Sequence, residues 1–180
     1  MKISKTFIKD LLIIEPKLFK DVRGFFYESY NKNNLDKVIN VVFVQDNESK
    51  SDKGVVRGLH FQFPPFEQAK LVRCVSGKIF DVAVDLRKNS KTYGKFFSIE
   101  LSSENNKQLF VPKGFAHGFQ VLSETAIVNY KVDSFYNPKS ESGIIWNDKD
   151  LSIDWNLDIK PILSFKDLEL ISFKKLKSLF

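Results

Sequence analysis

The stretch Lys70-Leu-Val-Arg-Cys-Val-Ser-Gly77-Lys-Ile-Phe-Asp-Val-Ala-Val-Asp-Leu-Arg87 holds two runs rich in β-branched and apolar residues on either side of a Ser-Gly pair. Runs of this composition favour β-strands, and a glycine between two of them favours a tight turn. We therefore predict a hairpin with strands over 70–75 and 78–86. In the second strand the residues from Phe80 to Leu86 are alternately apolar, and Asp81 and Asp85 stand between them, which predicts one apolar and one charged face.

Strand-like segments continue along the rest of the chain. They lie at 41–44, 55–63, 96–101, 108–111, 119–122 and 126–132. Short strands at this spacing are typical of an antiparallel sandwich or barrel. Helix signals are confined to the ends, with one short helix expected over 31–39 and another that begins at Ser164 as its N-cap and leads toward Leu179. No repeat or linker occurs, so we predict one all-β domain over residues 1–180.

The composition limits the classes of protein to consider. The chain has 180 residues, a net charge of +6 and one cysteine, Cys74. This cysteine cannot form an internal disulfide and fits a reducing compartment, and no run reaches the length of a membrane span, so we expect a cytoplasmic protein. The lysines are scattered and no DNA-binding spacing occurs, which argues against a nucleic-acid partner. Arg23 and Arg57 are candidates for bidentate phosphate or carboxylate contact, with a surface ion pair as the alternative.

Only two histidines occur, and each lies in a distinctive run. His60 stands in Gly-Leu-His-Phe-Gln, and His117 stands in Gly-Phe-Ala-His-Gly-Phe. Histidine is the side chain whose ordinary pKa lies near neutrality, so both are candidates for proton transfer. A hydrogen-bonded structural histidine is the competing interpretation for each.

The segment Pro112-Lys-Gly-Phe-Ala-His117 matches the second half of the metal-binding cupin pattern, Pro-x-Gly-x-x-His. Gly54, six residues before His60, matches the start of the first half. A metal-loaded cupin has a further histidine at the position of Gln62. Two histidines are too few for the three-nitrogen shell of such sites. We therefore predict a cupin barrel that uses neither a metal nor another cofactor.

Seven motifs in one order carry a resemblance to a known family. They are Phe19-Lys-Asp-Val-Arg-Gly-Phe-Phe-Tyr-Glu28, Val44-Gln-Asp-Asn47, Gly54-Val-Val-Arg-Gly-Leu-His-Phe-Gln62, Gln68-Ala-Lys-Leu-Val-Arg73, Phe80-Asp-Val-Ala-Val-Asp-Leu-Arg87, Pro112-Lys-Gly-Phe-Ala-His-Gly-Phe119 and Ile145-Trp-Asn-Asp148. On these motifs the chain resembles the dTDP-4-dehydrorhamnose 3,5-epimerases from about residue 10 to Asp167. No single motif is decisive, but their shared order makes the match specific.

The resemblance implies a cupin jelly roll of antiparallel strands with short peripheral helices, one of them C-terminal. It implies epimerisation of dTDP-4-dehydro-6-deoxy-D-glucose at C3 and C5 to dTDP-4-dehydro-L-rhamnose. Both carbons flank the C4 ketone, so the reaction needs a base, an acid and positive charge near the ketone oxygen. The resemblance implies His60 as the base, Asp167 as its partner carboxylate and Tyr130 as the proton donor. The remaining catalytic candidates, expected near the developing oxyanion, are Lys70, His117 and Asp81.

The resemblance also implies a homodimer that makes precursors for dTDP-L-rhamnose and for lipopolysaccharide or capsule, with no membrane partner. Arg23 and Glu28 belong to a segment that the family contributes across the dimer interface, which would make the site composite. Three aromatic residues are candidates to stack on the base or sugar, with core packing as the alternative: Phe26, Phe119 and Tyr136. The candidates to hold the nucleotide and its pyrophosphate are Arg23, Glu28, Gln45, Asp46, Asn47, Arg57, Glu141 and Lys166.

Three alternatives stay open. An epimerase acting at only C3 or only C5, or on another nucleotide-linked 4-keto sugar, would carry almost the same motifs. A metal-dependent cupin is disfavoured by Gln62, and a non-catalytic sugar-binding cupin is disfavoured because the expected base, acid and carboxylate are all present. The chain departs from the family at Phe63-Pro-Pro-Phe66, which is bulkier than the usual polar turn, and at Phe165. Both departures bear on substrate choice.

Overall fold

Two antiparallel sheets form the body of the protein. The computed structural model describes residues 1–155, 157 and 159–180. The six-stranded sheet has the order β1 (Lys2–Lys5), β2 (Leu12–Glu15), β10 (Gln108–Val111), β7 (Lys70–Ser76), β12 (Thr125–Val132) and β5 (Gln45–Asp52). The five-stranded sheet has the order β13 (Glu141–Gly143), β6 (Val56–Gln62), β11 (Phe115–Val121), β8 (Lys78–Asp85) and β9 (Phe96–Ser102).

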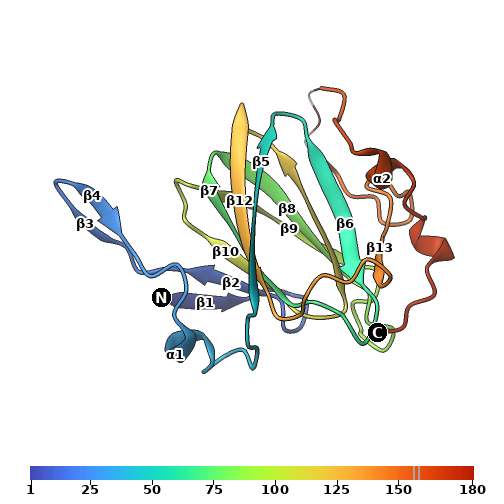
Figure 1. Cartoon of the computed structure of the whole chain (residues 1–180), viewed down its shortest axis with the longest axis horizontal. Helices are drawn as coiled ribbons and strands as arrows, with labels where there is room; N and C mark the ends of the chain where they lie inside the picture. The colour runs from blue at the N-terminus through green and yellow to red at the C-terminus, as the bar shows by residue number, and fades with distance from the viewer. Residues whose placement is uncertain (156, 158) are drawn as a thin grey trace.

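The sheets pack face to face, as Figure 1 shows. Their inner faces share one buried core, to which β7 and β12 contribute Val72 and Val128 and β8 and β11 contribute Ala83 and Phe119. Side chains alternate across a strand, so the neighbours of these residues point outward. A second apolar cluster lies outside the five-stranded sheet, where the C-terminal segment packs, and a third lies outside the six-stranded sheet. The all-β jelly roll expected from the sequence is confirmed.

Strands β6 and β11 approach each other closely at two glycines. Gly58 has a φ of +117°, and a Cβ at this position would lie 2.5 Å from the Cα of Gly118. A Cβ on Gly118 would lie 2.6 Å from the carbonyl oxygen of Arg57. Only glycine tolerates both the backbone angle and the short separation. The same pairing of β6 with β11 places His60 opposite His117.

The hairpin expected around Ser76-Gly77 is wrong. Strands β7 and β8 do follow each other there, but β7 pairs with β10 and β12, while β8 pairs with β9 and β11. The short turn therefore crosses from one sheet to the other. The charged face of β8 points into the sandwich, and Asp81 and Asp85 are both fully buried. The apolar face, with Val82 and Val84, is covered from outside by the C-terminal segment.

Other expected elements have different bounds. The run 41–44 is not a strand, since β5 begins at Gln45, and its apolar character reflects packing of Val41 and Phe43 against the outer cluster of the six-stranded sheet. The expected helix over 31–39 is reduced to α1 (Lys32–Leu35). The N-cap at Ser164 is confirmed, but α2 spans only Phe165–Leu168 and a 3₁₀ turn follows at Phe173–Lys175. Of the apolar residues beyond α2, Leu176 packs on the cluster outside the five-stranded sheet, whereas Leu179 is exposed.

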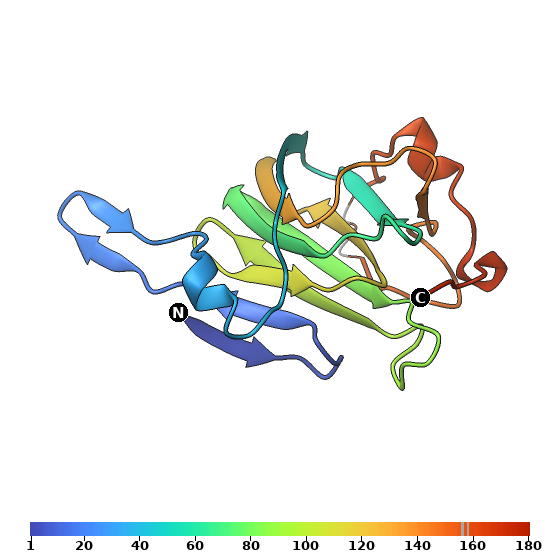
Figure 2. The same ribbon diagram turned by 60° about the horizontal axis from the view of Figure 1, so that its bottom comes forward.

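A two-stranded hairpin of β3 (Phe19–Asp21) and β4 (Gly24–Phe26) projects from the body (Figures 1 and 2). Its apolar side chains are open to solvent, and the exposed fraction of Phe26 is 67%. In the part of the chain that the structure describes, no helix is both long enough and apolar enough to cross a membrane.

The close approach of β6 and β11 predicts that Gly58→Ala will destabilise the fold. The added Cβ meets backbone, so the free energy of unfolding should fall by roughly 2–4 kcal/mol. Gly24→Ala is the matched control, because Gly24 has a φ of +127° but nothing lies within 4 Å of its Cβ position. It should cost about 1 kcal/mol. Urea unfolding followed by circular dichroism measures both, and equal losses would contradict the steric explanation.

Candidate active site

Apart from Asp167, which lies in α2, the predicted catalytic residues lie on the inner faces of both sheets. On the five-stranded sheet His60 pairs with His117, and Phe119 pairs with both Arg57 and Asp81. On the six-stranded sheet Tyr130 pairs with Val72, a residue of the inner core. Directly paired residues of neighbouring strands project to the same face. The candidate base and the candidate acid therefore come from opposite walls of the sandwich.

His60 is held by the buried carboxylate of Asp167. Nε2 of His60 bonds Oδ1 of Asp167. Oδ2 of the same carboxylate accepts a hydrogen bond of 2.8 Å from the Ser164 hydroxyl, which in turn accepts one of 3.1 Å from the Asp167 N–H. The side chain of His60 is 31% exposed, and that of Asp167 is 5% exposed. The carboxylate thus engages Nε2 and leaves Nδ1 as the ring nitrogen that can take a proton.

Hydrogen bonds keep Asp167 ionised. Burial by itself raises the pKa of this carboxyl, but the hydrogen bonds from His60 and Ser164 outweigh it, and the pKa lies below its ordinary value. The group is therefore a carboxylate near neutral pH. A carboxylate can only accept, so Nε2 of His60 is the donor, whereas in the histidine–aspartate pairs of serine hydrolases Nδ1 donates to the aspartate.

The second histidine makes a more buried pair. Nε2 of His117 lies 3.0 Å from both carboxylate oxygens of Asp81, and the side chains are 8% and 0% exposed. Lys70 is buried on the inner face of β7, and burial lowers the pKa of its ammonium to about 8, although Asp81 and Glu141 oppose the shift. Positive charge is therefore present inside the sandwich near neutral pH, and it is lost as the pH rises through about 8.

Tyr130 keeps its phenolic proton. Burial raises its pKa, while the charge of Arg57 partly opposes the shift. Arg57 is itself oriented, because its Nε donates a hydrogen bond of 3.0 Å to the hydroxyl of the buried Ser51. This leaves the two terminal nitrogens of the guanidinium to face a bound anion.

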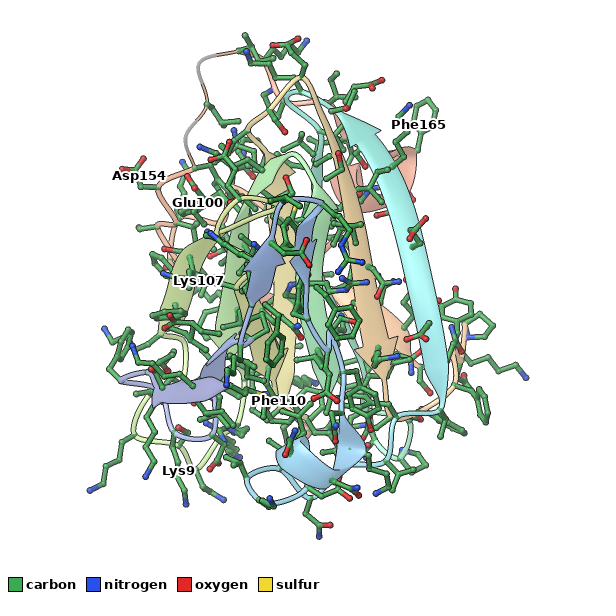
Figure 3. All side chains as sticks on the ribbon, turned by 90° about the vertical axis from the view of Figure 1, so that its left-hand side faces the viewer. Lys9, Glu100, Lys107, Phe110, Asp154 and Phe165 are labelled. Carbon is green, nitrogen blue, oxygen red and sulfur yellow. The ribbon has the colours of Figure 1, made fainter. Side chains whose placement is uncertain are left out.

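A polar group stands where β13 meets α2. The Tyr136 hydroxyl donates a hydrogen bond of 2.5 Å to Oε2 of Glu141, and Lys166 forms an ion pair with the same oxygen. Burial raises the pKa of Glu141, but the hydrogen bonds from Lys166 and Tyr136 outweigh this effect, so the pKa lies below its ordinary value. Phe165, beside Lys166, is 89% exposed and lies at the surface (Figure 3).

Some predicted binding residues are placed on the inner face and others are not. Gln45 and Asn47 lie on the inner face of β5, and the Gln45 amide donates 2.7 Å to Oδ1 of Asn47. Asp46 lies on the outer face, where Lys131 contacts it at 2.7 Å. Phe119 is 5% exposed and belongs to the inner core, so the core interpretation fits it better.

Three predicted residues lie on or beside the projecting hairpin, away from the catalytic group. The Arg23 side chain is 86% exposed and pairs with Asp21. Phe26 is exposed on β4, and Glu28 accepts a hydrogen bond of 2.9 Å from Asn31. Within a single chain, these three residues do not reach the catalytic residues.

The sequence reasoning missed two supporting hydroxyls. Ser164 was expected only as an N-cap, but it also bonds the Asp167 side chain. Its signal was the Ser-x-x-Asp spacing, which brings the two side chains together at the start of a helix. Ser51, which orients Arg57, carried no signal beyond its polar character on an inward strand. Among the described residues, no three His, Cys, Asp or Glu side chains gather where they could hold a metal ion.

Comparison with known proteins gives one consistent family. A family model described as dTDP-4-dehydrorhamnose 3,5-epimerase matches residues 5–175. A dTDP-4-dehydrorhamnose 3,5-epimerase of Shigella flexneri is 54% identical over 170 residues, which is 93% of each chain.

Solved structures agree with this likeness. The crystal structure of dTDP-4-dehydrorhamnose 3,5-epimerase from Elizabethkingia anophelis has a TM-score of 0.93 and 54% identity, covering 99% of this chain and 98% of that one. The dTDP-6-deoxy-D-glucose-3,5-epimerase of Legionella pneumophila, in complex with dTDP-4-keto-L-rhamnose, has a TM-score of 0.94 and 46% identity, covering 97% of this chain and 94% of that one.

The lowered pKa of Asp167 predicts how its contribution to stability changes with pH. A carboxyl whose pKa is lower in the folded state stabilises the protein above its unfolded pKa, and this stabilisation is lost as the pH falls through the folded pKa. Asp167→Asn should therefore lower the free energy of unfolding most at neutral pH, and progressively less below about pH 4. Urea unfolding of wild type and variant across that range measures the difference.

The exposed Asp154 provides a matched control (Figure 3), and Asp154→Asn should cost little at any pH. A penalty for Asp167→Asn that stays constant or grows as the pH falls would contradict the assigned pairing.

Proposed function

The chain belongs to the dTDP-4-dehydrorhamnose 3,5-epimerase family, and on that premise we propose how its own residues invert C3 and C5 of dTDP-4-dehydro-6-deoxy-D-glucose to give dTDP-4-dehydro-L-rhamnose. One observation carries the proposal. His60 and Tyr130 lie on the inner faces of opposite sheets, so a sugar ring between them would meet a base on one face and an acid on the other.

Each inversion is a proton exchange next to a ketone. Nδ1 of His60 removes the proton from the carbon, and the C–H electrons form an enolate with the C4 carbonyl. The Tyr130 hydroxyl then delivers its proton to the opposite face of the same carbon. Solvent takes the proton from His60 and returns one to the Tyr130 phenolate, which restores both groups. Asp167 stabilises the imidazolium while it carries the proton.

Charge inside the sandwich suits the enolate. Lys70 is buried on the same inner face as Tyr130, and the His117–Asp81 pair lies on the facing sheet. We assign Lys70 and His117 to positions beside the developing oxyanion, with Asp81 bonded to Nε2 of His117 and fixing its ring. Fixed donors and cations in a buried site cost little reorganisation when charge develops, which is why they accelerate such steps.

The remaining predicted binding groups have the chemistry to hold a nucleoside diphosphate. Arg57, held by Ser51, is assigned to the pyrophosphate, and the amides of Gln45 and Asn47 are assigned to the nucleotide. We assign Tyr136 to stack on the sugar or base, Lys166 to donate to nucleotide oxygens, and the Glu141 carboxylate to accept from an N–H or O–H of the nucleotide sugar. These groups come from several strands, from the loop that carries Tyr136 and from α2, which fits a single domain over 1–180. A nucleotide-linked substrate and a free buried Cys74 fit a cytoplasmic step in the supply of a surface polysaccharide.

The projecting hairpin supports a homodimer with a composite site. Val22 and Phe26 are fully or largely exposed, and apolar side chains gathered on a projection favour burial against a partner. Arg23 extends into solvent on the same hairpin. We assign Arg23, Phe26 and Glu28 to the substrate site of a second copy, which would supply the phosphate contacts that one chain lacks.

The base and acid assignments predict separable defects in D₂O. Wild type should incorporate deuterium at C3 and C5 with inversion at both, in the presence of EDTA, because the mechanism uses no metal. His60→Ala should lose exchange and inversion together, by about 10²- to 10⁴-fold. Tyr130→Phe should retain slow exchange without inversion, since only the proton donor is lost. NMR of the sugar protons measures each outcome.

The control for these variants is circular dichroism, which should show a folded protein in each case, with a lower melting temperature for His60→Ala because it removes a partner of the buried Asp167. Undiminished exchange in His60→Ala would remove His60 from the role of base. Label at C3 alone, or at C5 alone, in the wild type would instead identify a mono-epimerase.

The composite site predicts complementation between two inactive variants. Arg23→Ala damages the site of the partner, whereas His60→Ala damages the site of its own chain. A mixed dimer then has one site with both defects and one with neither, so mixing after subunit exchange should restore about a quarter of wild-type activity. In a comparison mixture, Asp46→Ala takes the place of Arg23→Ala, because Asp46 lies on the outer face of its sheet. Activity that stays at the sum of the two variants, or a monomeric mass by light scattering, would refute the composite site.

A further inference from the structure

Gln62 occupies the position at which a metal-binding cupin carries a histidine, and its side chain is engaged in another way. It lies on the inner face of β6 and is 4% exposed. Its Nε2 donates hydrogen bonds to the carbonyl oxygens of Phe66, at 2.6 Å, and of Phe135, at 3.2 Å. Its Oε1 accepts a hydrogen bond of 2.8 Å from the N–H of Asn137.

These three bonds bracket Tyr136. The amide of Gln62 holds the carbonyl of the residue before it and the N–H of the residue after it. The third bond, to Phe66, ties the Phe63–Phe66 turn to the same amide. The backbone on both sides of Tyr136 is thereby fixed to the strand that carries His60.

The tip of the Tyr136 side chain is fixed as well. Its hydroxyl bonds Glu141, and the register of β13 places Glu141 opposite Gln62. The ring itself is 55% exposed, so it faces solvent with both ends held. This is the arrangement of a platform placed for a ligand, because an aromatic ring with little freedom loses little entropy when it stacks.

We propose that Gln62 is a positioning residue that sets the place of Tyr136 against the bound nucleotide sugar. The proposal rests on the proposed function, which assigns Tyr136 to stacking. Only an amide of this length supplies two donors and one acceptor at these places. A carboxylate lacks the donors, a thioether lacks all three bonds, and a neutral histidine has one donor and one acceptor.

The first test is a double-mutant cycle between Gln62→Met and Tyr136→Ala. Gln62→Met keeps the volume and removes all three bonds, and KM should rise roughly tenfold while kcat changes by less than about threefold. In the Tyr136→Ala background Gln62→Met should add almost nothing, since its effect acts through the ring. Effects that multiply in the double variant would overturn the proposal.

A matched comparison separates positioning from general loosening of the loop. The Gln68 amide donates one bond of 2.7 Å to the carbonyl of Ser134, two residues before Tyr136. Gln68→Met should therefore raise KM much less than Gln62→Met. Equal increases would show that loop stiffness alone matters, and they would also overturn the proposal.

The affinity for dTDP-glucose, measured by calorimetry, separates this claim from the reaction itself. This ligand has no C4 ketone and cannot be epimerised, so its Kd responds to Tyr136 whether or not the assigned chemistry is right. If wild type fails to epimerise but Kd follows the cycle, the proposed function fails and the role of Gln62 stands. An unchanged Kd in a folded Gln62→Met variant refutes the role.

If Gln62→Met does not fold, Gln62→Glu keeps the shape and supplies the test. Its carboxylate cannot donate to two carbonyls at neutral pH, but the protonated form regains one donor. Kd for dTDP-glucose should therefore improve as the pH falls in Gln62→Glu and stay flat in wild type. Parallel pH profiles would overturn the proposal.

Discussion

The packing of two antiparallel sheets with their inner faces together is the constraint on which the site depends. Inversion at carbon requires a proton to leave one face and return to the other, and no single strand or helix can present groups to both faces of a ring. Here β6 of one sheet carries His60 and β12 of the other carries Tyr130. The shared apolar core sets the separation of the sheets, so residues of that core determine where the proposed base and acid lie.

The charges and pKa shifts inside the sandwich are consistent with the proposed roles. Asp167 stays ionised because His60 and Ser164 bond it, and in the proposed mechanism it stabilises the imidazolium of His60. Tyr130 stays protonated because it is buried, which suits a donor. Lys70 has a lowered pKa of about 8 and still supplies charge near neutral pH. The two histidines of the chain thus differ by environment, since His117 is enclosed with Asp81 and His60 is open on one side.

Sequence patterns predicted the positions of most strands better than the pairing of those strands. Periodicity identified β7 and β8 but could not show that they belong to different sheets, because both are buried on two sides. The prediction of a strand at 41–44 ended just before β5 begins, so the alternation along β5 was missed. That alternation sets Asp46 on the face opposite Gln45 and Asn47. His60 and Asp167 lie 107 positions apart, so resemblance to a family, and not spacing, suggested the pair. The hydrogen bonds of Gln62 are made to backbone groups of loops, and no sequence pattern predicts such bonds.

The most direct test of this account uses the fact that the chain has only two histidines. Diethyl pyrocarbonate acylates accessible imidazole nitrogens, and mass spectrometry locates the adduct. The account predicts that His60 reacts first, that loss of epimerisation follows its modification one to one, and that a bound nucleotide sugar protects it. Modification of the enclosed His117 ahead of His60, or full activity with His60 acylated, would contradict the claim that His60 is the base between the two sheets.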